Sequence, residues 1–562
     1  MNRNSGRNLY NNHKHLFLFF ISAILGTVIF LLIYGFKIIN PTYDDWILNK
    51  GGDVAQHYLG WKFYRNSPWH FPIGLIDGLN AHKPISCMFT DSIPLFAIPF
   101  KILSPILPET FQYTGIWGMF CFFMMGGISS LLLYRFNKST PFCILGSIFF
   151  IISPSVLQRM FGHEALSGQW IIVTALLFWI YQNHKWKHKA TPIILWSILG
   201  AVAVLVHIYF IPMIYAVMLG YVLTDILCNK KIIRPIICFI STTCSFLFIM
   251  FIIGGFYGEG NMQAGGLGVY SANYNSLFNA FNYSKFLKPL NSNKGQAEGF
   301  GYLGLGIIIA GIIALVITFL IIEERTKSLK NLKKLITNKY KIIIAISAVI
   351  IVSMFVAASP VGTLNARTVY TIDYPDKITD ILSIFRASGR FVWIVLYIVY
   401  TAVFALISKL DKKKTVIFIT ALCLSIQIMD LKDFLIDKHK YFTETKNYSF
   451  KLDDESYNEI TTGADEIVFL PLPENFLGYV KLYIHFGEYA SRHNMKLSSF
   501  YAARADYDSL SGYAAEKYKE LENNSGDQNI LYVFFNKNDI PELNKNLHIY
   551  EIAGYTVGRY IE

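Results

Sequence analysis

The chain has 562 residues, of which 53% are hydrophobic and only 16% are charged, and its mean hydropathy is +0.38. This composition excludes an ordinary soluble globular protein and predicts a polytopic membrane protein. The net charge of +12 is unevenly divided, since residues 1–429 hold 36 Lys and Arg against 16 Asp and Glu, whereas residues 430–562 hold 14 against 22. Two parts in different surroundings are expected. Because the chain has no Walker or Rossmann glycine motif, cytoplasmic ATP-driven chemistry is not expected. A nucleic-acid partner is not expected either.

Eleven apolar runs are long enough, at roughly 20 residues each, to cross about 30 Å of hydrocarbon. The run at 141–157 is the weakest because Ser153-Pro154-Ser155 interrupts it, although proline is tolerated in membrane helices. Other divisions of the runs give about ten to thirteen spans. The eleven runs lie near 16–36, 111–134, 141–157, 165–182, 192–208, 209–227, 234–255, 302–322, 341–358, 391–409 and 415–429.

Lys and Arg cluster at alternate connections between these runs, for example at 135–138, 230–234 and 409–414. The positive-inside rule places such connections in the cytoplasm. The N-terminal segment 1–15 is then cytoplasmic, and the loop 37–110 lies on the opposite side. We therefore predict a transmembrane domain at 16–429, followed by an extracytoplasmic domain at 430–562.

The loop 37–110 begins with a run of chemistry-bearing residues, GGDVAQHYLGW. Asp53, Gln56, His57 and Gly60 are spaced to share one helical face, so a carboxylate and an imidazole can point at one substrate. The same spacing is also that of a capping box, with Asp53 as N-cap and Gln56 at the third helical position. The two roles do not exclude each other.

Asp91, in MFTDSIPLFAIPF, precedes a short apolar run that is expected to lie along the membrane surface. Its likelier local role is that of an N-cap. The same loop carries aromatic residues that suit sugar stacking, although an interfacial aromatic belt gives the same composition and is favoured. These aromatics are Tyr58, Trp61, Phe63, Tyr64, Trp69 and Phe71.

Three later segments on the same predicted face of the membrane are unusually polar. FGHEALSGQW places His163 at the mouth of a helix, and NKGQAEGFGYLGLG places Glu298 among glycines that allow close approach of a ligand. FRASGRFVW sets Arg386 and Arg390 one helical turn apart at the outer end of a span. Two guanidinium groups there suit a phosphate on a lipid carrier, although snorkelling to the headgroups is equally consistent with the pattern.

The C-terminal residues 430–562 predict a small α/β domain that covers or braces the membrane part. Strand-like runs occur at 466–473 and 530–536, and a helical stretch surrounds 513–521. The last residues, HIYEIAGYTVGRYIE, predict a hairpin that turns near Gly554.

Together these features resemble the GT-C glycosyltransferases, and most closely the bacterial members of unknown specificity near the YfhO-like proteins. The resemblance is carried by GGDVAQHYLGW, TDSIPLFA, GHEALSGQW, QAEGFGYLGLG and FRASGRFVW, and it spans about residues 16 to 410. It implies a GT-C-like helical membrane fold in a bacterial inner membrane. It also implies transfer of a sugar, with inversion, from a polyprenyl-phosphate donor to a glycan, lipid or protein acceptor outside the cytoplasm.

The resemblance also implies roles for individual residues. Asp53 matches the acid of the first loop and would act as general base on the acceptor hydroxyl. Asp91 resembles the second acid, which would position hydroxyl groups. Arg386 and Arg390 would neutralise the phosphate leaving group, and Gln56, His57, His163 and Glu298 would hold sugar or phosphate.

Two alternatives concern the chemistry. Asp44 or Asp45 can replace Asp53 as base, because paired acids in the first loop are also a GT-C feature. No cofactor is certain, since the acids are numerous enough for a divalent cation but no ligand spacing demands one.

Two further alternatives concern the function. A carrier or flippase of lipid-linked saccharides would need a similar cationic groove, but alternating access favours polar groups at mid-membrane and repeated halves. A polymerase or ligase that uses a lipid-pyrophosphate donor would share most of the chemistry.

Overall fold

The computed structural model describes residues 3–80, 83–184, 188–257, 265–326, 329–444, 447–449, 452, 455–472, 479–500, 506–541 and 545–561. The chain forms two compact units. Unit 1 comprises Met1–Ile39, Gly115–Leu247 and Gly265–Glu444. Unit 2 comprises Asn40–Thr114, Phe248–Ala264 and Thr445–Glu562.

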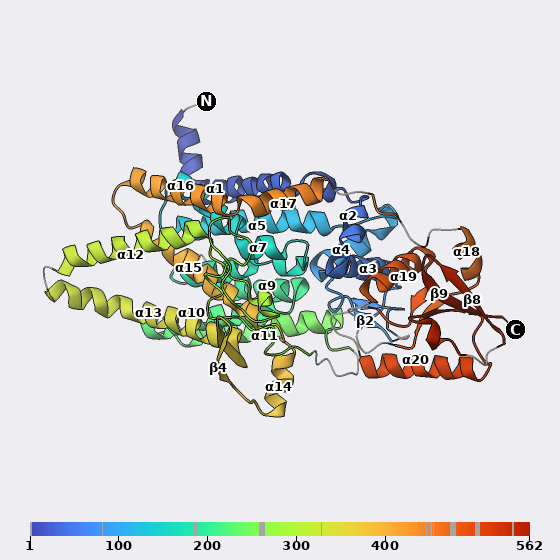
Figure 1. Ribbon diagram of the computed structural model, residues 1–562. Coiled ribbons are helices and arrows are strands. Elements are labelled where there is room, and N and C mark those ends of the chain that lie inside the picture. Colours follow the sequence, from blue (N-terminus) through green and yellow to red (C-terminus); the bar gives the residue numbers. More distant parts are fainter. Residues whose placement is uncertain are drawn as a thin grey trace. The chain divides into compact units, whose positions relative to one another are not determined.

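Unit 1 is almost entirely helical (Figure 1). Its α-helices are α1 (Arg3–Tyr34), α5 (Thr114–Tyr134), α6 (Thr140–Ile151), α7 (Pro154–Arg159), α8 (Trp170–Ile180), α9 (Thr191–Val206), α10 (Phe210–Asn229), α11 (Ile233–Ile253), α12 (Leu305–Thr326), α13 (Leu329–Ala358), α14 (Asp376–Ser383), α15 (Val392–Ile407), α16 (Lys413–Asp430) and α17 (Lys432–Thr443). The last turn of α11 belongs to unit 2. Short 3-10 helices are η1 (Lys37–Ile39), η3 (Glu164–Ser167), η4 (Gln296–Gly299) and η5 (Ser388–Phe391), and the strands β3 (Val361–Leu364) and β4 (Arg367–Thr371) form a hairpin.

Each of the eleven predicted runs falls on a helix, but the count of eleven spans is not confirmed. Among the described residues, seven helices are long and apolar enough to cross a membrane, and an eighth span is possible if α16 and α17, bent by 57°, count as one. Three runs form shorter apolar helices, at Glu164–Ile180, Thr191–Val206 and Leu305–Phe319. By length and composition, the chain is a multi-pass membrane protein.

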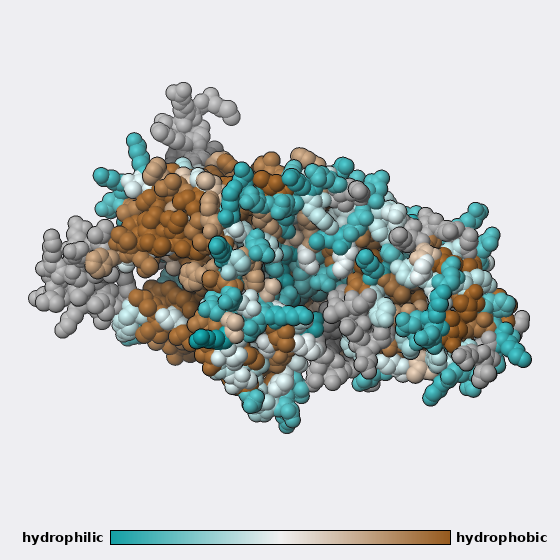
Figure 2. Space-filling model, in the orientation of Figure 1, coloured by the Kyte–Doolittle hydropathy of each residue, from teal (hydrophilic) through white to brown (hydrophobic). Residues whose placement is uncertain are grey.

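The surface of unit 1 supports this assignment. Figure 2 shows apolar side chains gathered over α12 and α13. Leu315 and Phe319 of α12 are both 68% exposed, and Ile351 of α13 is 67% exposed. Water-facing surfaces rarely carry such extended apolar patches, whereas lipid favours them.

Helix α15 is central to unit 1 and contacts α8, α10, α12 and α13. Trp393, Tyr397 and Tyr400 of this helix are fully buried. Their polar atoms are satisfied inside the bundle, since Trp393 Nε1 donates to Phe300 O (2.9 Å) and Tyr400 Oη donates to Leu303 O (2.7 Å). Because η5 runs directly into α15, this packing fixes the position of the residues in η5.

Unit 2 contains a five-stranded sheet of order β6-β5-β7-β9-β8, flanked by helices. Strands β6 (Lys496–Leu497), β5 (Glu466–Leu470) and β7 (Ile530–Phe534) are parallel, and β9 (Tyr555–Tyr560) and β8 (Leu547–Ile552) are antiparallel to their neighbours. Of the predicted strand runs 466–473 and 530–536, residues Glu466–Leu470 and Ile530–Phe534 form strands, and the helix and the hairpin at Gly554 are confirmed. The helices are α18 (Glu455–Thr461), α19 (Val480–His493) and α20 (Tyr507–Glu522), with a 3-10 turn η7 (Lys537–Asp539).

The first loop folds together with this C-terminal segment within unit 2. It forms α2 (Asp45–Lys50), α3 (Gly52–Asn66), the strand pair β1 (Leu75–Ile76) and β2 (Ile85–Ser86), α4 (Pro94–Ile102) and η2 (Ser104–Ile106). Helix α3 packs on α19, and Leu497 N–H of β6 donates to Gly78 O (2.7 Å). This grouping differs from the sequence-based division, which assigned the whole loop to the transmembrane domain.

Candidate functional site

In unit 1, one carboxylate is shared by two guanidinium groups. Glu298 of η4 accepts from Arg390 Nε (3.0 Å) and Nη2 (2.8 Å) through Oε2 and from Arg159 Nη1 (3.1 Å) through Oε1. Arg159 Nη2 also donates to the Glu298 main-chain oxygen (2.9 Å). We call these three residues the Glu298 cluster. Arg159 ends the candidate span Thr140–Arg159, and Arg390 lies at the start of the span Ser388–Ile407.

The electrostatics of the Glu298 cluster favour an additional anion. Burial by itself raises the pKa of Glu298, but Arg159 and Arg390 outweigh it and lower the pKa to about 2. The carboxylate is therefore ionised at neutral pH, and the cluster holds two positive charges against one negative charge. The Glu298 side chain is 28% exposed, so the cluster is not sealed. A phosphate group is the natural partner of such paired guanidinium forks.

Two glycines bring the loops that carry Glu298 and Arg390 together. A Cβ atom on Gly389 would lie 2.8 Å from the Cα of Gly299, and one on Gly299 would lie 3.2 Å from the Cα of Gly389. The Gly389 N–H also donates to Tyr270 O (3.0 Å). A side chain at either position would push η4 and η5 apart.

Buried amides fix the start of η4. Gln296 Nε2 donates to Thr363 Oγ1 (2.6 Å), and its Oε1 accepts from Asn273 Nδ2 (2.9 Å). Asn273 Nδ2 also donates to Asn365 O (2.7 Å). Because all of these partners lie in unit 1, Glu298 is presented on a rigid loop, as a binding group requires.

His163 joins the surroundings of the Glu298 cluster through a series of rings. Its ring lies 5.7 Å from the ring of His207, which in turn lies 5.3 Å from that of Tyr209. The Arg390 guanidinium lies over Tyr209 at 4.6 Å, within the range of a cation–π contact. His163 thus lies in the same part of unit 1 as the Glu298 cluster. That these groups share one face of the membrane stays a prediction.

Arg386 differs from its prediction. It does not lie on one helix with Arg390, because α14 ends at Ser383 and η5 begins only at Ser388. Arg386 instead lies over the Tyr270 ring at 5.7 Å and donates to Gly265 O (3.1 Å). The expected one-turn spacing is wrong, because the chain turns between the two arginines.

In unit 2, Asp53, the acid of the first loop that was expected to act as base, lies on α3. The capping box expected there is wrong, because the N-cap of α3 is Gly51 and not Asp53. Glycine has no side chain that could accept the capping hydrogen bond. Asp53 is the second residue of the helix and is partly exposed, in a position where a carboxylate also suits the helix dipole. Gln56 and His57 follow on α3 and are each only 3% exposed. Among the described residues, Gln56 Nε2 has no hydrogen-bond partner.

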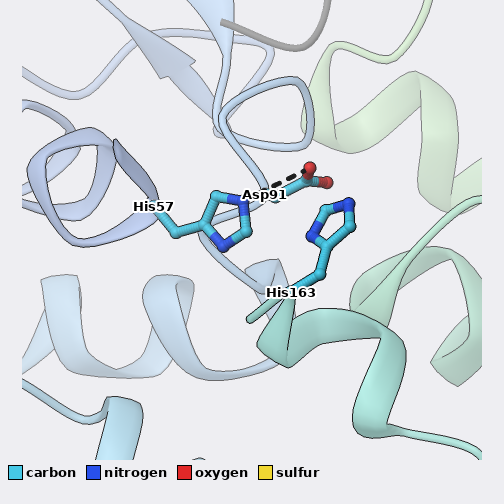
Figure 3. A group of neighbouring side chains, drawn as sticks. All are labelled: His57, Asp91 and His163. Carbon is cyan, nitrogen blue, oxygen red and sulfur yellow. Dashed lines mark ion pairs between the residues drawn. The ribbon is translucent and has the colours of Figure 1, made fainter. Parts of the chain in front are cut away.

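His57 and Asp91 face each other in unit 2, with Nε2 and Oδ2 3.6 Å apart (Figure 3). Asp91 is 8% exposed and has φ 51°, a left-handed conformation that is uncommon outside glycine. Asp91 was expected to be the N-cap of α4, but this is wrong, because Ile93 takes that position with φ 52°. His163, also drawn in Figure 3, belongs to unit 1.

A close helix contact holds the segment of Asp91 against α3. A Cβ atom on Gly60 would lie 2.6 Å from the Cβ of Thr90, so only glycine fits there. Ser92 Oγ donates to His57 O (3.2 Å). Two left-handed residues in one short turn are strained, and such strain concentrates at functional sites.

Asp44 and Asp45 were the alternative bases. Asp44 Oδ2 accepts from Tyr58 Oη (2.7 Å), and burial raises its pKa, an effect that the Tyr58 hydrogen bond partly opposes. Asp45 is in the first turn of α2. Neither position tests which acid acts as base.

Most of the loop aromatics are neither a membrane belt nor sugar platforms. Tyr58, Trp61, Phe63 and Tyr64 are at most 5% exposed and form part of the core of unit 2. Trp69 and Phe71 are exposed, at 49% and 62%. The favoured interpretation as a belt is therefore wrong for α3, whose aromatics pack inside the unit; Trp61, for example, lies against Phe111 and Tyr113.

The sequence did not single out Arg159 or Tyr209. Arg159 was visible as a charged residue at the end of an apolar run, which is a recognisable signal for function in membrane proteins. Its partner, however, is 139 residues away in the chain. Tyr209 carried no signal beyond its position next to a span.

Comparison with known proteins adds the following. None of the curated proteins matches this chain. The solved structure of the Archaeoglobus fulgidus oligosaccharyltransferase in the apo form is similar, with a TM-score of 0.46 and 11% identity over 93% of this chain and 70% of that one. Residues 456–560 match the DUF6311 C-terminal domain. Residues 23–432 match the model described as domain of unknown function DUF6311, and the chain belongs to this family.

Proposed function

We propose that this chain is an integral-membrane glycosyltransferase of the GT-C type in a bacterial inner membrane. It transfers a sugar from a polyprenyl-phosphate donor to a glycan, lipid or protein acceptor on the extracytoplasmic side. The observation that carries the proposal is the Glu298 cluster, in which two arginines at the ends of apolar helices share one acid. An excess of positive charge at that place suits the phosphate of a lipid carrier.

Arg390 is the residue we expect to contact the phosphate. Its fork is held in one orientation by Glu298 and by the Tyr209 ring, so little ordering is needed when an anion arrives. As the bond to the sugar breaks, negative charge grows on the departing phosphate. A preorganised guanidinium stabilises that charge without needing a metal.

Asp53 remains the proposed general base. It is partly exposed, whereas Asp44 already accepts from Tyr58 and Asp91 is nearly buried beside His57. A base must reach the hydroxyl whose proton it removes, typically for a gain of about 10²–10⁴-fold. Asp91 would then position hydroxyl groups.

The test is transfer of labelled sugar from short-chain polyprenyl-phosphate donors to a membrane extract. Purified wild type, Asp53→Asn, Arg390→Ala and Arg390→Lys are compared with Arg367→Ala, which removes an exposed arginine of β4 in the same unit. We expect transfer by wild type and Arg367→Ala, loss in Asp53→Asn and Arg390→Ala, and only partial rescue by lysine, which lacks the fork.

Other outcomes separate the alternatives. Transfer by Arg390→Ala at the wild-type rate would remove the Glu298 cluster as the phosphate site. Donor binding that requires Arg390, with no product from any donor, would favour the carrier. Transfer from lipid-pyrophosphate donors alone would favour the polymerase or ligase.

A further inference from the structure

Glu298 brings a negative charge to a place that is proposed to bind a negative phosphate. Its side chain is 28% exposed, whereas those of Arg159 and Arg390 are 6% and 9% exposed. The carboxylate is therefore the part of the Glu298 cluster that an incoming anion meets first. Burial raises the pKa of Glu298, but the two arginines lower it to about 2, so the charge is present at neutral pH. Such a charge weakens the attraction of the arginines for an anion.

The two arginines are held in place by groups other than this carboxylate. The Arg390 guanidinium lies over the Tyr209 ring at 4.6 Å. Arg159 Nη2 donates to the main-chain oxygen of Glu298 (2.9 Å), and the Arg159 guanidinium lies 5.6 Å from the centre of the Trp393 ring. The carboxylate thus adds its charge to a placement that these contacts already support.

The proposed transfer changes the charge of the phosphate. The donor is a phosphodiester with a single ionised oxygen. When the bond between a phosphate oxygen and the anomeric carbon breaks, the electron pair stays on that oxygen. The anomeric carbon bonds to the acceptor oxygen, and the proton of the acceptor hydroxyl goes to the base. The lipid phosphate that remains is a monoester, which carries about 1.5–2 negative charges at pH 7.

Two arginines without a counter-ion would bind this product more tightly than the donor, because Coulomb attraction is proportional to the charge of the ligand. The product would then leave slowly and keep the next donor out. A fixed negative charge beside the arginines weakens binding of both ligands, but its effect on the free energy of binding is about twice as large for the doubly charged product. Glu298 is suitably placed, since Oε2 lies 2.8 Å from Arg390 Nη2 and Oε1 lies 3.1 Å from Arg159 Nη1.

We propose that Glu298 is a specificity-determining residue, which makes the Glu298 cluster favour the phosphodiester donor over the monoester product. This role rests on the proposed function, because it requires that the cluster binds the phosphate. The carboxylate then weakens phosphate binding and promotes release of the product, whereas the family resemblance implies that Glu298 holds sugar or phosphate.

The experiment measures the affinity of the full-length protein in lipid nanodiscs for two probes that lack a sugar. Geranyl phosphate represents the monoester product, and geranyl methyl phosphate represents the diester donor. Isothermal titration calorimetry at about pH 7.5, where the monoester is almost fully ionised, gives the Kd of each probe. Protein-free nanodiscs give the partition of each probe into lipid.

Three variants separate charge from structure. Glu298→Gln removes the charge, and Glu298→Asp keeps it on a shorter side chain. Asp376→Asn is the control, because it removes the charge of an exposed acid on α14 in the same unit. Thermal melts and gel filtration check that each variant is folded.

The measured quantity is the ratio of the Kd of the diester to the Kd of the monoester. We expect Glu298→Gln to raise this ratio by about 5-fold or more. Glu298→Asp and Asp376→Asn should keep the wild-type ratio. Loosened arginines would weaken binding of both probes alike, so the ratio reports the charge. A wild-type ratio in Glu298→Gln, or the same increase in Glu298→Asp, would overturn the proposed role of Glu298.

Failure of the proposed function would look different. If neither wild type nor any variant binds either probe more than protein-free nanodiscs do, the Glu298 cluster is not a phosphate site, and both proposals are wrong. If both probes bind to wild type and lose affinity equally in Glu298→Gln, the phosphate site stands and only the proposed role of Glu298 is wrong.

Discussion

Glu298 shows how one residue can organise two others that are remote in the chain. Its carboxylate neutralises half of the positive charge of Arg159 and Arg390 and orients both guanidinium groups by hydrogen bonds. The carboxylate on the short turn η4 therefore acts as an internal counter-ion that an incoming phosphate would partly replace.

The first prediction concerns pH. The pKa of Glu298 in the folded protein is about 2, below its ordinary value of 4.5. The ion pairs therefore stabilise the fold fully above about pH 4.5, and this stabilisation is lost as the pH falls toward 2. This stabilisation by the ion pairs of Glu298 is at most about 3 kcal/mol. We expect Glu298→Gln to lower the melting temperature at pH 7 and to flatten the pH dependence below 4.5. Thermal melts of the purified protein test this, with exposed Glu459→Gln as control; equal pH profiles would contradict it.

The second prediction concerns Asp91. Asparagine tolerates its left-handed conformation, so Asp91→Asn removes the charge without adding backbone strain. We expect stability within about 1 kcal/mol of wild type and a transfer rate at least about 10-fold lower. The transfer assay measures this, with exposed Asp508→Asn as control. An unchanged rate would leave the His57–Asp91 pair a structural role only.

At the scale of elements, the crossing of η4 and η5 determines whether the Glu298 cluster exists. The crossing requires the absence of side chains at two positions, and α15 then fixes η5 by burying Trp393 and Tyr397. A binding group on short turns is precise only when such packing leaves the turns no freedom.

The third prediction follows from that crossing. Gly389→Ala places a methyl group 2.8 Å from the Gly299 Cα and the Tyr270 carbonyl oxygen, so η4 and η5 must separate. We expect a loss of about 1–3 kcal/mol, as for overpacked sites, together with loss of transfer. Gly512→Ala is the control, because nothing lies near its added methyl group in α20 and alanine favours a helix. Sugar transfer by Gly389→Ala at the wild-type rate would show that the close crossing of η4 and η5 is not required for transfer.

At the scale of the whole molecule, unit 2 is assembled from three segments that are far apart in the chain. Glu488 of α19 is fully buried and accepts from Lys62 of α3 (3.3 Å) and from Arg492 (2.7 Å). The C-terminal segment therefore supports the helix that carries Asp53 and His57.

The fourth prediction tests this support. Glu488→Gln leaves Lys62 without its buried counter-ion and is expected to cost about 3–5 kcal/mol. Faster hydrogen exchange in α3 should accompany the loss. Glu520→Gln is the matched control, because it breaks a partly exposed pair with Lys517, worth about 0–1 kcal/mol. Similar exchange in both variants would mean that α19 does not stabilise α3.

Local sequence patterns were enough to predict the elements whose signal lies between neighbouring residues. Apolar runs form helices, strands lie within the predicted runs 466–473 and 530–536, and Gly554 marks a hairpin, because hydropathy and turn chemistry act between neighbouring residues. Candidate residues such as Glu298 and Arg390 were recognised one by one, as charges next to spans.

How these residues are combined depends on contacts that form only in the folded chain. The tertiary structure replaced the Arg386–Arg390 pair by the Glu298 cluster, in which Glu298 is 139 and 92 residues from its two partners, and it buried the aromatics of α3 in the core of unit 2. It also placed Gly51 and Ile93, instead of Asp53 and Asp91, at the N-cap positions of α3 and α4. Pairing of charges and burial of faces depend on contacts between distant segments, and no local pattern specifies those contacts.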